Sequence, residues 1–401
     1  MFPSVRIVFI SEWFSDRMGY AENCLPKAVA ALGHEVHLIT SNVQPYFDSP
    51  TYSETYEPFL GSAVSVCGDQ QLDGYTLHRL PFAKFKGQLR MRGLVNKLRA
   101  VRPHVVQVFD EISLTTYEAA LAKSFLGYRL FLESHRHKSV FYTSLCSGHP
   151  MWSRFSWSYY APSIGRLVSF LSEKCYAISV DAADISTLFF GVEKKKVSVC
   201  SLGVDTDLFR PPSNAMAQQA RSQLRRELGF SSSDIVCIYT GRFNKDKNPL
   251  CLAQAIEILA GQGKPFRGLF VGNGPQAEAI RAHRASVICP FMPFRELPRF
   301  YWAADIGVWP KQESTSQLDA AACGLPIILG DRVHVLERVD GNGLLYEEDN
   351  PHQLAHQLET LSNPRLRQRL GECGARKMQE HFSWSHIARQ RIHDYEEALR
   401  R

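Results

Sequence analysis

The stretch from Val308 to Leu329 reads V-W-P-K-Q-E-S-T-S-Q-L-D-A-A-A-C-G-L-P-I-I-L, and it decides the fold that we expect for the whole chain. The apolar run ending at Pro310 predicts a buried parallel strand. Ser314 to Ser316 are good N-cap residues, and Gln317 to Cys323 then predicts a short helix packed through its alanines. A glycine and a proline after this helix end it. The stretch therefore predicts one strand-loop-helix unit of an α/β fold.

Two acidic residues of this unit are candidates for binding a ligand. Glu313 lies in the loop at the carboxyl end of the predicted strand, and Asp319 lies in the first turns of the helix. Helix N-termini attract anions, and open α/β sheets bind ligands in crevices at the carboxyl ends of their strands. The alternative is an ordinary strand-loop-helix unit with solvated acids.

Length and composition point to a globular protein of more than one domain. The chain has 401 residues, of which 45% are hydrophobic and 21% charged, and single cores stop growing at about 250–300 residues. No apolar run reaches the roughly 20 residues of a membrane span, and the N-terminus enters a strand pattern without a charged leader. The ten cysteines include no C-x-x-C pair, so we expect buried thiols, a cytoplasmic location and no metal site.

The distribution of charge matters more than the net charge. A net charge of +6 is modest for this length and argues against a dedicated nucleic-acid binder. Residues 82–102, however, interleave apolar residues with seven cations, namely Lys84, Lys86, Arg90, Arg92, Lys97, Arg99 and Arg102. This pattern predicts an amphipathic helix that contacts an anionic membrane from the inner face or an anionic acceptor. The alternative is a solvated surface helix.

The first half of the chain alternates strand and helix patterns. Val5 to Ile10 predicts a strand, followed by a loop that contains Gly19, and Ala21 to Leu32 predicts a helix. A later strand, Tyr128 to Glu133, is followed by S-H-R-H-K, which places His135 at the same sheet edge as Gly19. The aromatic segment 141–160 has no clear period, so an acceptor-facing loop, a membrane-touching surface and irregular core packing all stay open.

A second alternating series begins after a linker rich in glycine, aspartate and proline at 201–212. A strand ending at Thr240 leads into G-R-F-N-K-D-K-N-P, which brings Gly241, Arg242 and Lys247 to a helix N-terminus. Two cations at such a place suit a diphosphate. The next strand leads into Gly272-Asn273-Gly274-Pro275, a second turn of the same style.

These motifs together resemble family 4 of the glycosyltransferases. The resemblance spans almost the whole chain and rests on seven motifs in the family's order: G-H-E-V from Gly33, L-G-V-D-T-D-L-F-R-P from Leu202, T-G-R-F-N-K-D-K-N-P from Thr240, V-G-N-G-P from Val271, E-L-P-R-F-Y-W-A-A-D from Glu296, L-D-A-A-A-C-G-L-P from Leu318 and G-N-G-L-L-Y from Gly341. No one motif is decisive, but their order is specific to the family.

The resemblance implies an α/β fold of two Rossmann-like domains facing across a cleft, called GT-B. It implies an acceptor-side domain at 1–203, a donor-binding domain at 204–384 and a C-terminal helix at 385–401 that crosses back to the first domain. The implied activity is retaining transfer of a sugar from a UDP-, GDP- or ADP-sugar to a hydroxyl of a glycan, a lipid-linked or a small-molecule acceptor. It needs no metal and no cofactor besides the donor.

The resemblance also assigns roles to the candidate residues. The catalytic set that it implies is Arg242, Lys247, Glu313 and His135. The donor-binding set that it implies is Gly19, Gly241, Arg242, Lys247, Gly272, Asn273, Glu313, Ser316, Gln317 and Asp319. Within these sets the two cations bind the diphosphate, Glu313 holds the donor sugar, Asp319 holds the ribose, and His135 faces the transferred sugar.

The acidic stretch departs from the family pattern. The family's two acids are separated by seven residues, whereas five separate Glu313 from Asp319, and Lys311 occupies the position at the family spacing. Either Glu313 or Lys311 therefore faces the donor sugar. A sugar-nucleotide epimerase or phosphorylase of the same architecture and a noncatalytic nucleotide-sugar-binding scaffold are the alternatives to a transferase.

Overall fold

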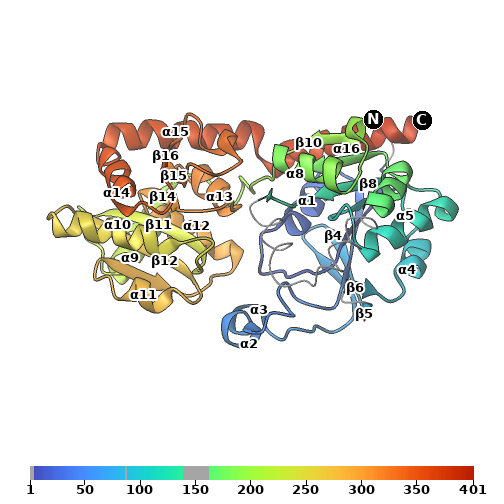
Figure 1. Ribbon diagram of the computed structural model, residues 1–401, viewed down its shortest axis with the longest axis horizontal. Coiled ribbons are helices and arrows are strands. Elements are labelled where there is room, and N and C mark those ends of the chain that lie inside the picture. Colours follow the sequence, from blue (N-terminus) through green and yellow to red (C-terminus); the bar gives the residue numbers. More distant parts are fainter. Residues whose placement is uncertain (1–3, 86–87, 139–161) are drawn as a thin grey trace. The chain divides into compact units, whose positions relative to one another are not determined.

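The computed structural model describes residues 4–85, 88–138 and 162–401. The chain divides into two compact units (Figure 1), a first unit of Met1–Leu202 with Trp384–Arg401 and a second unit of Gly203–Ser383. The aromatic segment 141–160 lies outside the described residues, as does Lys86.

The first unit is built on an eight-stranded sheet in the order β10-β9-β8-β7-β1-β2-β4-β3. The strands pair in parallel except β3, which pairs antiparallel with β4. Their bounds are β1 Arg6–Ser11, β2 Glu35–Ser41, β3 Gly68–Leu72, β4 Tyr75–Leu80, β7 Val105–Val108, β8 Arg129–Ser134, β9 Lys174–Ala177 and β10 Val197–Val199. The order reverses between β1 and β7, so the carboxyl ends of these two strands flank the crevice where such sheets bind ligands.

The helices of the first unit include one from the far end of the chain. Their bounds are α1 Ala21–Ala30, α2 Tyr52–Thr55, α3 Glu57–Leu60, α4 Leu94–Val101, α5 Leu114–Leu126, α8 Val180–Asp184, a π-helical turn at Ile185–Phe189, a 3₁₀ turn at Lys194–Lys196, and α16 Trp384–Arg400. The C-terminal helix α16 packs against α1 and β8. Residues nearly the whole chain apart in sequence therefore share one core.

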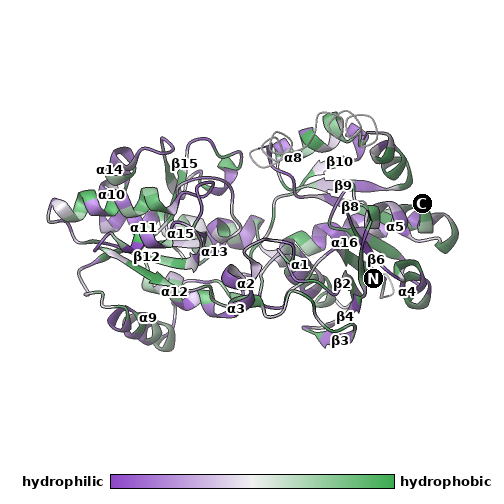
Figure 2. Cartoon of the chain, turned by 60° about the horizontal axis from the view of Figure 1, so that its bottom comes forward, coloured by the Kyte–Doolittle hydropathy of each residue, from purple (hydrophilic) through white to green (hydrophobic). Residues whose placement is uncertain are grey.

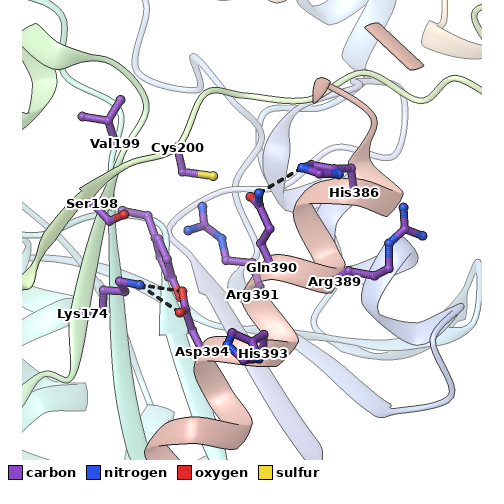
Figure 3. A pocket seen from close by; sticks show the side chains of 11 residues that line it. Lys174, Ser198, Val199, Cys200, His386, Arg389, Gln390, Arg391, His393 and Asp394 are labelled. Carbon is purple, nitrogen blue, oxygen red and sulfur yellow. Dashed lines mark hydrogen bonds and ion pairs between the residues drawn. The ribbon is translucent and has the colours of Figure 1, made fainter. Parts of the chain in front are cut away.

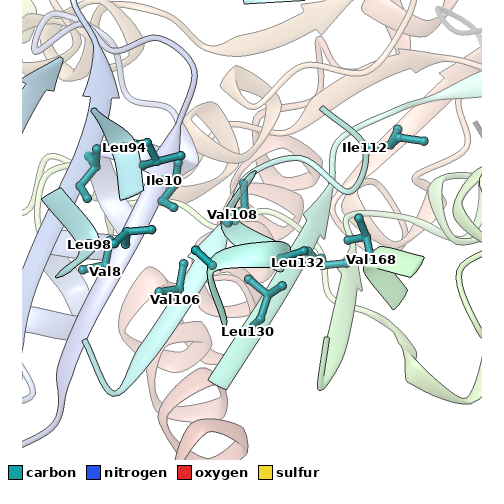
Figure 4. Close-up of a cluster of buried hydrophobic side chains, with 14 of the residues drawn as sticks. Val8, Ile10, Leu94, Leu98, Val106, Val108, Ile112, Leu130, Leu132 and Val168 are labelled. Atoms are coloured by element: carbon teal, nitrogen blue, oxygen red, sulfur yellow. The ribbon is translucent and has the colours of Figure 1, made fainter. Parts of the chain in front are cut away.

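The core of the first unit lies between the central strands and the helices that cover them. Figure 4 shows Leu94 and Leu98 of α4 beside β1, and Leu132 of β8 beside Val168. The buried residues labelled there from β1, α4, β7 and β8 are Val8, Ile10, Leu94, Leu98, Val106, Val108, Leu130 and Leu132. The central strands are mostly apolar, as expected of a parallel sheet covered on both faces, but β7 and β8 also bury the polar residues Gln107 and Glu133.

The prediction of one helix for the basic segment 82–102 is wrong. β5, Phe82–Phe85, and β6, Gln88–Met91, pair as antiparallel strands, and only α4 after them is helical. The alternation in Q-L-R-M buries Leu89 and Met91, which is the period of two of a strand rather than the period of a helix.

The second unit is a six-stranded parallel sheet in the order β13-β12-β11-β14-β15-β16. The strand bounds are β11 Ile235–Arg242, β12 Phe266–Asn273, β13 Ser286–Cys289, β14 Ile306–Trp309, β15 Ile327–Gly330 and β16 Gly343–Tyr346. From β11 the chain adds β12 and β13 on one side, and it then adds β14, β15 and β16 on the other side of β11. The order therefore reverses between β11 and β14.

Helices cover the second sheet. Their bounds are α9 Ala215–Glu227, α10 Pro249–Gly261, α11 Ala277–Arg281, α12 Leu297–Ala303, α13 Ser316–Ala322, α14 Pro351–Thr360 and α15 Pro364–His381, with 3₁₀ turns at Phe294–Glu296 and Leu336–Arg338. Helix α10 packs on β12 and α14, α13 packs on α15, and α12 packs on α9. Figure 2 shows hydrophobic colour along β12, whereas helices such as α14 and α15 mix both colours. The predicted α/β fold of two parallel-sheet units is confirmed.

Over the part of the chain that the structure describes, no helix combines the length and the apolar character of a membrane span.

Candidate functional site

Two glycines shape the carboxyl ends of β11 and β12 in the second unit. Gly241 and Gly272 pair across the two strands, with φ of 143° and 153°. A Cβ on Gly272 would lie 1.9 Å from the carbonyl oxygen of Gly241, so no other residue fits there. The next residue, Asn273, accepts a hydrogen bond from the backbone N–H of Gly274 at 2.8 Å through its own side chain. The predicted glycine turns thus lie side by side at one sheet edge.

Lys247 follows β11 and reaches the loop that follows β14. Its ammonium donates a hydrogen bond to the carbonyl oxygen of Glu313 at 2.5 Å. Burial, and then the positive charge of Arg242, lower the pKa of Lys247 to about 8, and Arg338 acts in the same direction. Three cations therefore crowd the point where the strand order reverses, and their repulsion favours an anion there.

The loop from Lys311 to Ser316 is held by backbone and side-chain contacts. The Glu313 carboxylate, which is buried, accepts a hydrogen bond from the backbone N–H of His334 at 2.9 Å. The Lys311 ammonium instead contacts Asp349, at 2.9 Å from Oδ2. Sequence reasoning missed both His334 and Asp349, because each lies more than 20 residues away along the chain.

A buried arginine also holds this loop. Arg338 has 1% of its surface exposed and donates to the carbonyl oxygen of Ser314 at 3.1 Å and to Oε1 of Gln317 at 3.3 Å. The Gln317 amide donates in turn to the carbonyl oxygen of Gln312 at 3.2 Å. Gln317 is therefore buried and holds the loop through its hydrogen bonds to Arg338 and Gln312. Its contact with a donor stays a prediction.

The start of α13 differs from the expected cap. Thr315 precedes the helix in helical backbone conformation, and its side chain makes no capping hydrogen bond. The Ser316 hydroxyl accepts from the indole N–H of Trp309 at 2.9 Å and lies 2.7 Å from the Ser314 hydroxyl. The N-cap position therefore falls within the predicted run Ser314 to Ser316, at Thr315, but among the described residues no side chain caps the helix.

Asp319 lies one turn into α13 with 6% of its surface exposed. Burial, and then the charge of Asp205, raise the pKa of the Asp319 carboxyl well above its ordinary value. A ligand that donates hydrogen bonds to this carboxyl would lower its pKa again. A bound group with hydroxyl donors would therefore favour the ionised form of Asp319.

His135 follows β8 in the first unit, at the sheet edge that was predicted. Its Nε2 lies 3.2 Å from Oε1 of the buried Glu133, and its ring meets Phe109 edge to face at 6.2 Å. Burial would lower the pKa of His135, but the carboxyls of Glu133, Glu22 and Glu111 raise it above its ordinary value. His135 is half-buried among acids.

The other polar residues of the S-H-R-H-K segment are engaged within the first unit. Arg136 Nη2 contacts both oxygens of Asp110, at 3.0 and 2.9 Å. Lys138 lies 2.7 Å from Asp184, and His137 lies 3.4 Å from Asp181. Gly19 lies in the loop between β1 and α1.

Sequence reasoning missed a set of acids around the edge where the first sheet reverses. Burial raises the pKa of Glu12, Glu22 and Glu111 to about 7 in each case. Glu12 and Glu111 follow the carboxyl ends of β1 and β7, the two strands that flank the reversal. The position of an acid after a strand can be seen in the sequence. Its burial, which raises its pKa, can be seen only in the structure.

Two family models match this chain. The model described as Glycosyltransferase Family 4 matches residues 25–208, and the model described as Glycosyl transferases group 1 matches residues 234–363.

Among the described residues, no group of three histidine, cysteine or acidic side chains is arranged to hold a metal ion.

Curated relatives match over part of their length. Spore coat protein SA of Bacillus subtilis is 27% identical over 234 residues, which are 53% of this chain and 61% of that protein. D-inositol 3-phosphate glycosyltransferase of Xylanimonas cellulosilytica is 29% identical over 247 residues, which are 57% of this chain and 58% of that protein. The chain thus spans about three fifths of the length of these relatives.

Solved structures match over the whole fold. Anabaena Alr3699/HepE, solved in complex with UDP and glucose, has a TM-score of 0.68 and 15% identity, and the match covers 97% of this chain and 98% of that one. Likeness at this level of identity shows the fold. With both halves matched by family models and the predicted motifs in place, the chain belongs to family 4 of the glycosyltransferases and has their GT-B fold.

Proposed function

We propose that this protein transfers a glycosyl group from a nucleoside diphosphate sugar to a hydroxyl group of an acceptor. The observation that carries the proposal is the gathering of Arg242, Lys247 and Arg338 at the reversal point of the second sheet, where burial first and then the charges of the two arginines lower the pKa of Lys247 to about 8. A diphosphate would relieve this repulsion and would gain most as charge develops on it.

The donor would be held by the second unit. Arg242 and Lys247 would bind the diphosphate, close to the backbone of Gly241, Gly272 and Asn273 at the strand ends. Asp319 would accept hydrogen bonds from the ribose. Glu313 would accept hydrogen bonds from the donor sugar, since a carboxylate is an acceptor for hydroxyl groups and Lys311 is not. Ser316 and Gln317 would shape this loop.

The acceptor side would be formed by the first unit, with Gly19 at the phosphate and His135 toward the transferred sugar. In the reaction the bond from the anomeric carbon to the leaving phosphate oxygen breaks, and a bond from the same carbon to the acceptor oxygen forms. The acceptor hydroxyl gives its proton to the leaving phosphate, which departs as nucleoside diphosphate. Attack on the face that the leaving group vacates would retain the anomeric configuration.

The related proteins support this proposal at the level of substrate class. One relative is named as a glycosyltransferase acting with inositol 3-phosphate, and Alr3699/HepE was solved with UDP and glucose. A UDP-sugar is therefore the first donor to test, followed by GDP- and ADP-sugars. The acceptor class stays open among glycans, lipid-linked sugars and small molecules.

The test is a thermal-shift screen of the full chain against UDP-, GDP- and ADP-sugars, followed by turnover assays with the stabilising donor. A transferase releases nucleoside diphosphate in proportion to glycosylated acceptor, and NMR of the product's anomeric proton reports retention. Release without an acceptor would favour an epimerase. Binding without any turnover across acceptor classes would favour a noncatalytic scaffold.

A further inference from the structure

Arg391 of the C-terminal helix α16 is a buried cation in the first unit. Only 2% of its surface is exposed, and its guanidinium carbon lies 3.2 Å from the centre of the Tyr176 ring. Its Nη2 lies 3.5 Å from Oε2 of Glu133, and among the described residues no hydrogen-bond partner is found for its buried Nε and Nη1. Because burying a charge is costly unless it is paired, Glu133 is the group that compensates Arg391.

Glu133 is in turn shared between α16 and the candidate catalytic histidine. Its Oε2 faces Arg391 and accepts from the amide of Gln107 at 2.6 Å, while its Oε1 lies 3.2 Å from Nε2 of His135. Tyr395, one turn after Arg391, donates its hydroxyl proton to Gln107 Oε1. One buried carboxylate therefore joins the end of the chain to His135.

The helix is fixed in place by a second polar contact. Asp394 lies 2.9 Å from the Lys174 ammonium through each of its oxygens and accepts from the Tyr176 hydroxyl at 2.7 Å. Figure 3 shows Lys174 joined to Asp394 beside Arg391, around a cavity of about 500 Å³ between α16, β9 and β10. These contacts of Asp394 join α16 to β9 one turn away from Arg391.

The charges around His135 decide what this arrangement can do. Burial would raise the pKa of Glu133, but Arg391 and His135 hold it below its ordinary value, so Glu133 stays ionised. Besides Glu133, the carboxyls of Glu22 on α1 and Glu111 after β7 also face His135, and Arg136 pairs with Asp110 and Glu111 next to them. His135 is therefore surrounded by carboxyl groups, and the one that raises its pKa most, Glu133, is paired with Arg391.

From these contacts we propose that Arg391 is a positioning residue of the transferase, which fixes the ring orientation and the protonation state of His135 through Glu133. The proposal rests on the proposed function only for the importance of His135 in turnover. The coupling from Arg391 to His135 is a property of the folded chain itself.

The first test measures the pKa of His135 by NMR titration of the nucleotide-free full chain, with His135→Asn to assign the resonance. Arg391→Met removes a nearby cation, so the apparent pKa of the Glu133–His135 pair should rise, and the measured pKa of His135 should rise with it. Removing the paired carboxylate should lower it, by about 1 unit for Glu133→Gln. The control is Arg389→Met, an exposed arginine of the same helix, which should leave the pKa unchanged.

The second test follows turnover against pH. The limb of the kcat profile that depends on His135 is the one that disappears in His135→Asn, and it should move up in Arg391→Met and down in Glu133→Gln. Arg391→Lys, which keeps the charge, should restore most of the wild-type limb. A melting curve alone cannot give these opposite shifts, because loss of packing lowers stability in both variants.

Two further outcomes decide the inference where folding or function fails. If Arg391→Met does not fold, the double variant Arg391→Met/Glu133→Gln removes both buried charges, and its His135 pKa should fall below that of wild type. If Arg391→Met folds and leaves both the His135 pKa and the limb in place, Arg391 is only structural and the inference is overturned. If no donor and acceptor turn over in wild type, the proposed function fails, while the NMR titration still decides the coupling.

Discussion

The ammonium of Lys247 donates a hydrogen bond to the carbonyl oxygen of Glu313 at 2.5 Å, which ties the loop after β11 to the loop after β14. The two residues are 66 positions apart. The contact brings the predicted diphosphate cation and the predicted sugar-binding acid to the same reversal point of the sheet.

Substituting either diphosphate cation should reduce turnover without unfolding the protein. Arg242→Ala and Lys247→Ala each remove a charge that is needed mainly as the leaving group develops charge, and losing one such contact costs about 10²–10³ in kcat. Steady-state kinetics with the stabilising donor measure the loss. Lys245→Ala, an exposed neighbour on the same loop, is the matched control. A variant at Arg242 or Lys247 with kcat/KM near wild type would show that the diphosphate lies elsewhere.

Nucleotide affinity should fall as the pH rises through about 8. The pKa of Lys247 is lowered from 10.5 to about 8, chiefly by burial. A bound diphosphate favours the charged ammonium, so binding above this pH requires the uptake of a proton. Calorimetry with UDP in buffers of different ionisation enthalpy measures that uptake. In Lys247→Met the uptake should vanish, and an unchanged uptake in this variant would assign the proton to another group.

The same shift gives a stability prediction with a definite sign. Because the folded-state pKa of Lys247 lies below its unfolded value, the unfolded chain binds more protons between about pH 8 and 10.5. The contribution of Lys247 to the free energy of unfolding should therefore increase with pH across this window. Chemical denaturation of wild type and Lys247→Met at several pH values measures the difference, and no pH-dependent difference between them would contradict the burial of the ammonium.

Substitutions of the two acids should separate nucleotide binding from sugar positioning. Asp319→Asn should weaken binding of free nucleoside diphosphate as well as of the sugar nucleotide, because the ribose loses a carboxylate acceptor. Glu313→Gln should spare the free nucleotide and lower kcat, since it disturbs only the donor sugar. Calorimetry and kinetics on both variants measure the split.

Lys311 provides the competing assignment. In the structure its ammonium contacts Asp349 on the loop after β16, and we expect Lys311→Ala to be nearly silent. A crippling effect of Lys311→Ala together with a silent Glu313→Gln would place Lys311 at the donor sugar instead.

Chelation should leave activity unchanged. The one Asp-x-Asp sequence, Asp205 to Asp207, lies in the linker 201–212 and not directly after a strand, and fixed cations at the diphosphate would replace a metal ion. The measurement is turnover before and after dialysis against EDTA. Loss of activity that manganese restores would contradict the metal-independent mechanism.

Contact with an anionic membrane through residues 82–102 stays a prediction, and the structure changes its basis. The segment is a strand pair followed by a short helix, and Arg90 and Lys97 pair with Glu118 and Asp69. If unpaired charge suffices for binding, the protein should co-sediment with anionic liposomes and lose binding at high salt, since the Debye length is about 8 Å at physiological ionic strength. Equal binding to neutral liposomes, or none to either, would leave a solvated surface.

The sequence by itself determined the elements whose signals are local. The strands β1 and β8 lie within one residue of their predicted bounds at each end, since a run of apolar residues bounded by polar residues or glycine predicts a buried strand. The α/β class and the family followed from motifs in order, because each motif is a short strand-end turn with its own composition. In residues 82–102 the pattern fits both the period of a strand and that of a helix, and it therefore predicted the wrong element.

Only the tertiary structure decided which distant residues share an environment. Lys247 meets the Glu313 carbonyl, and Arg391 meets Glu133 from the far end of the chain, because parallel sheets align strand ends that are separated by whole helices. Burial follows from the same packing, so the raised pKa of Asp319 and the lowered pKa of Lys247 were not readable from the chain. A residue's type is a local property, but its charge state depends on everything packed around it.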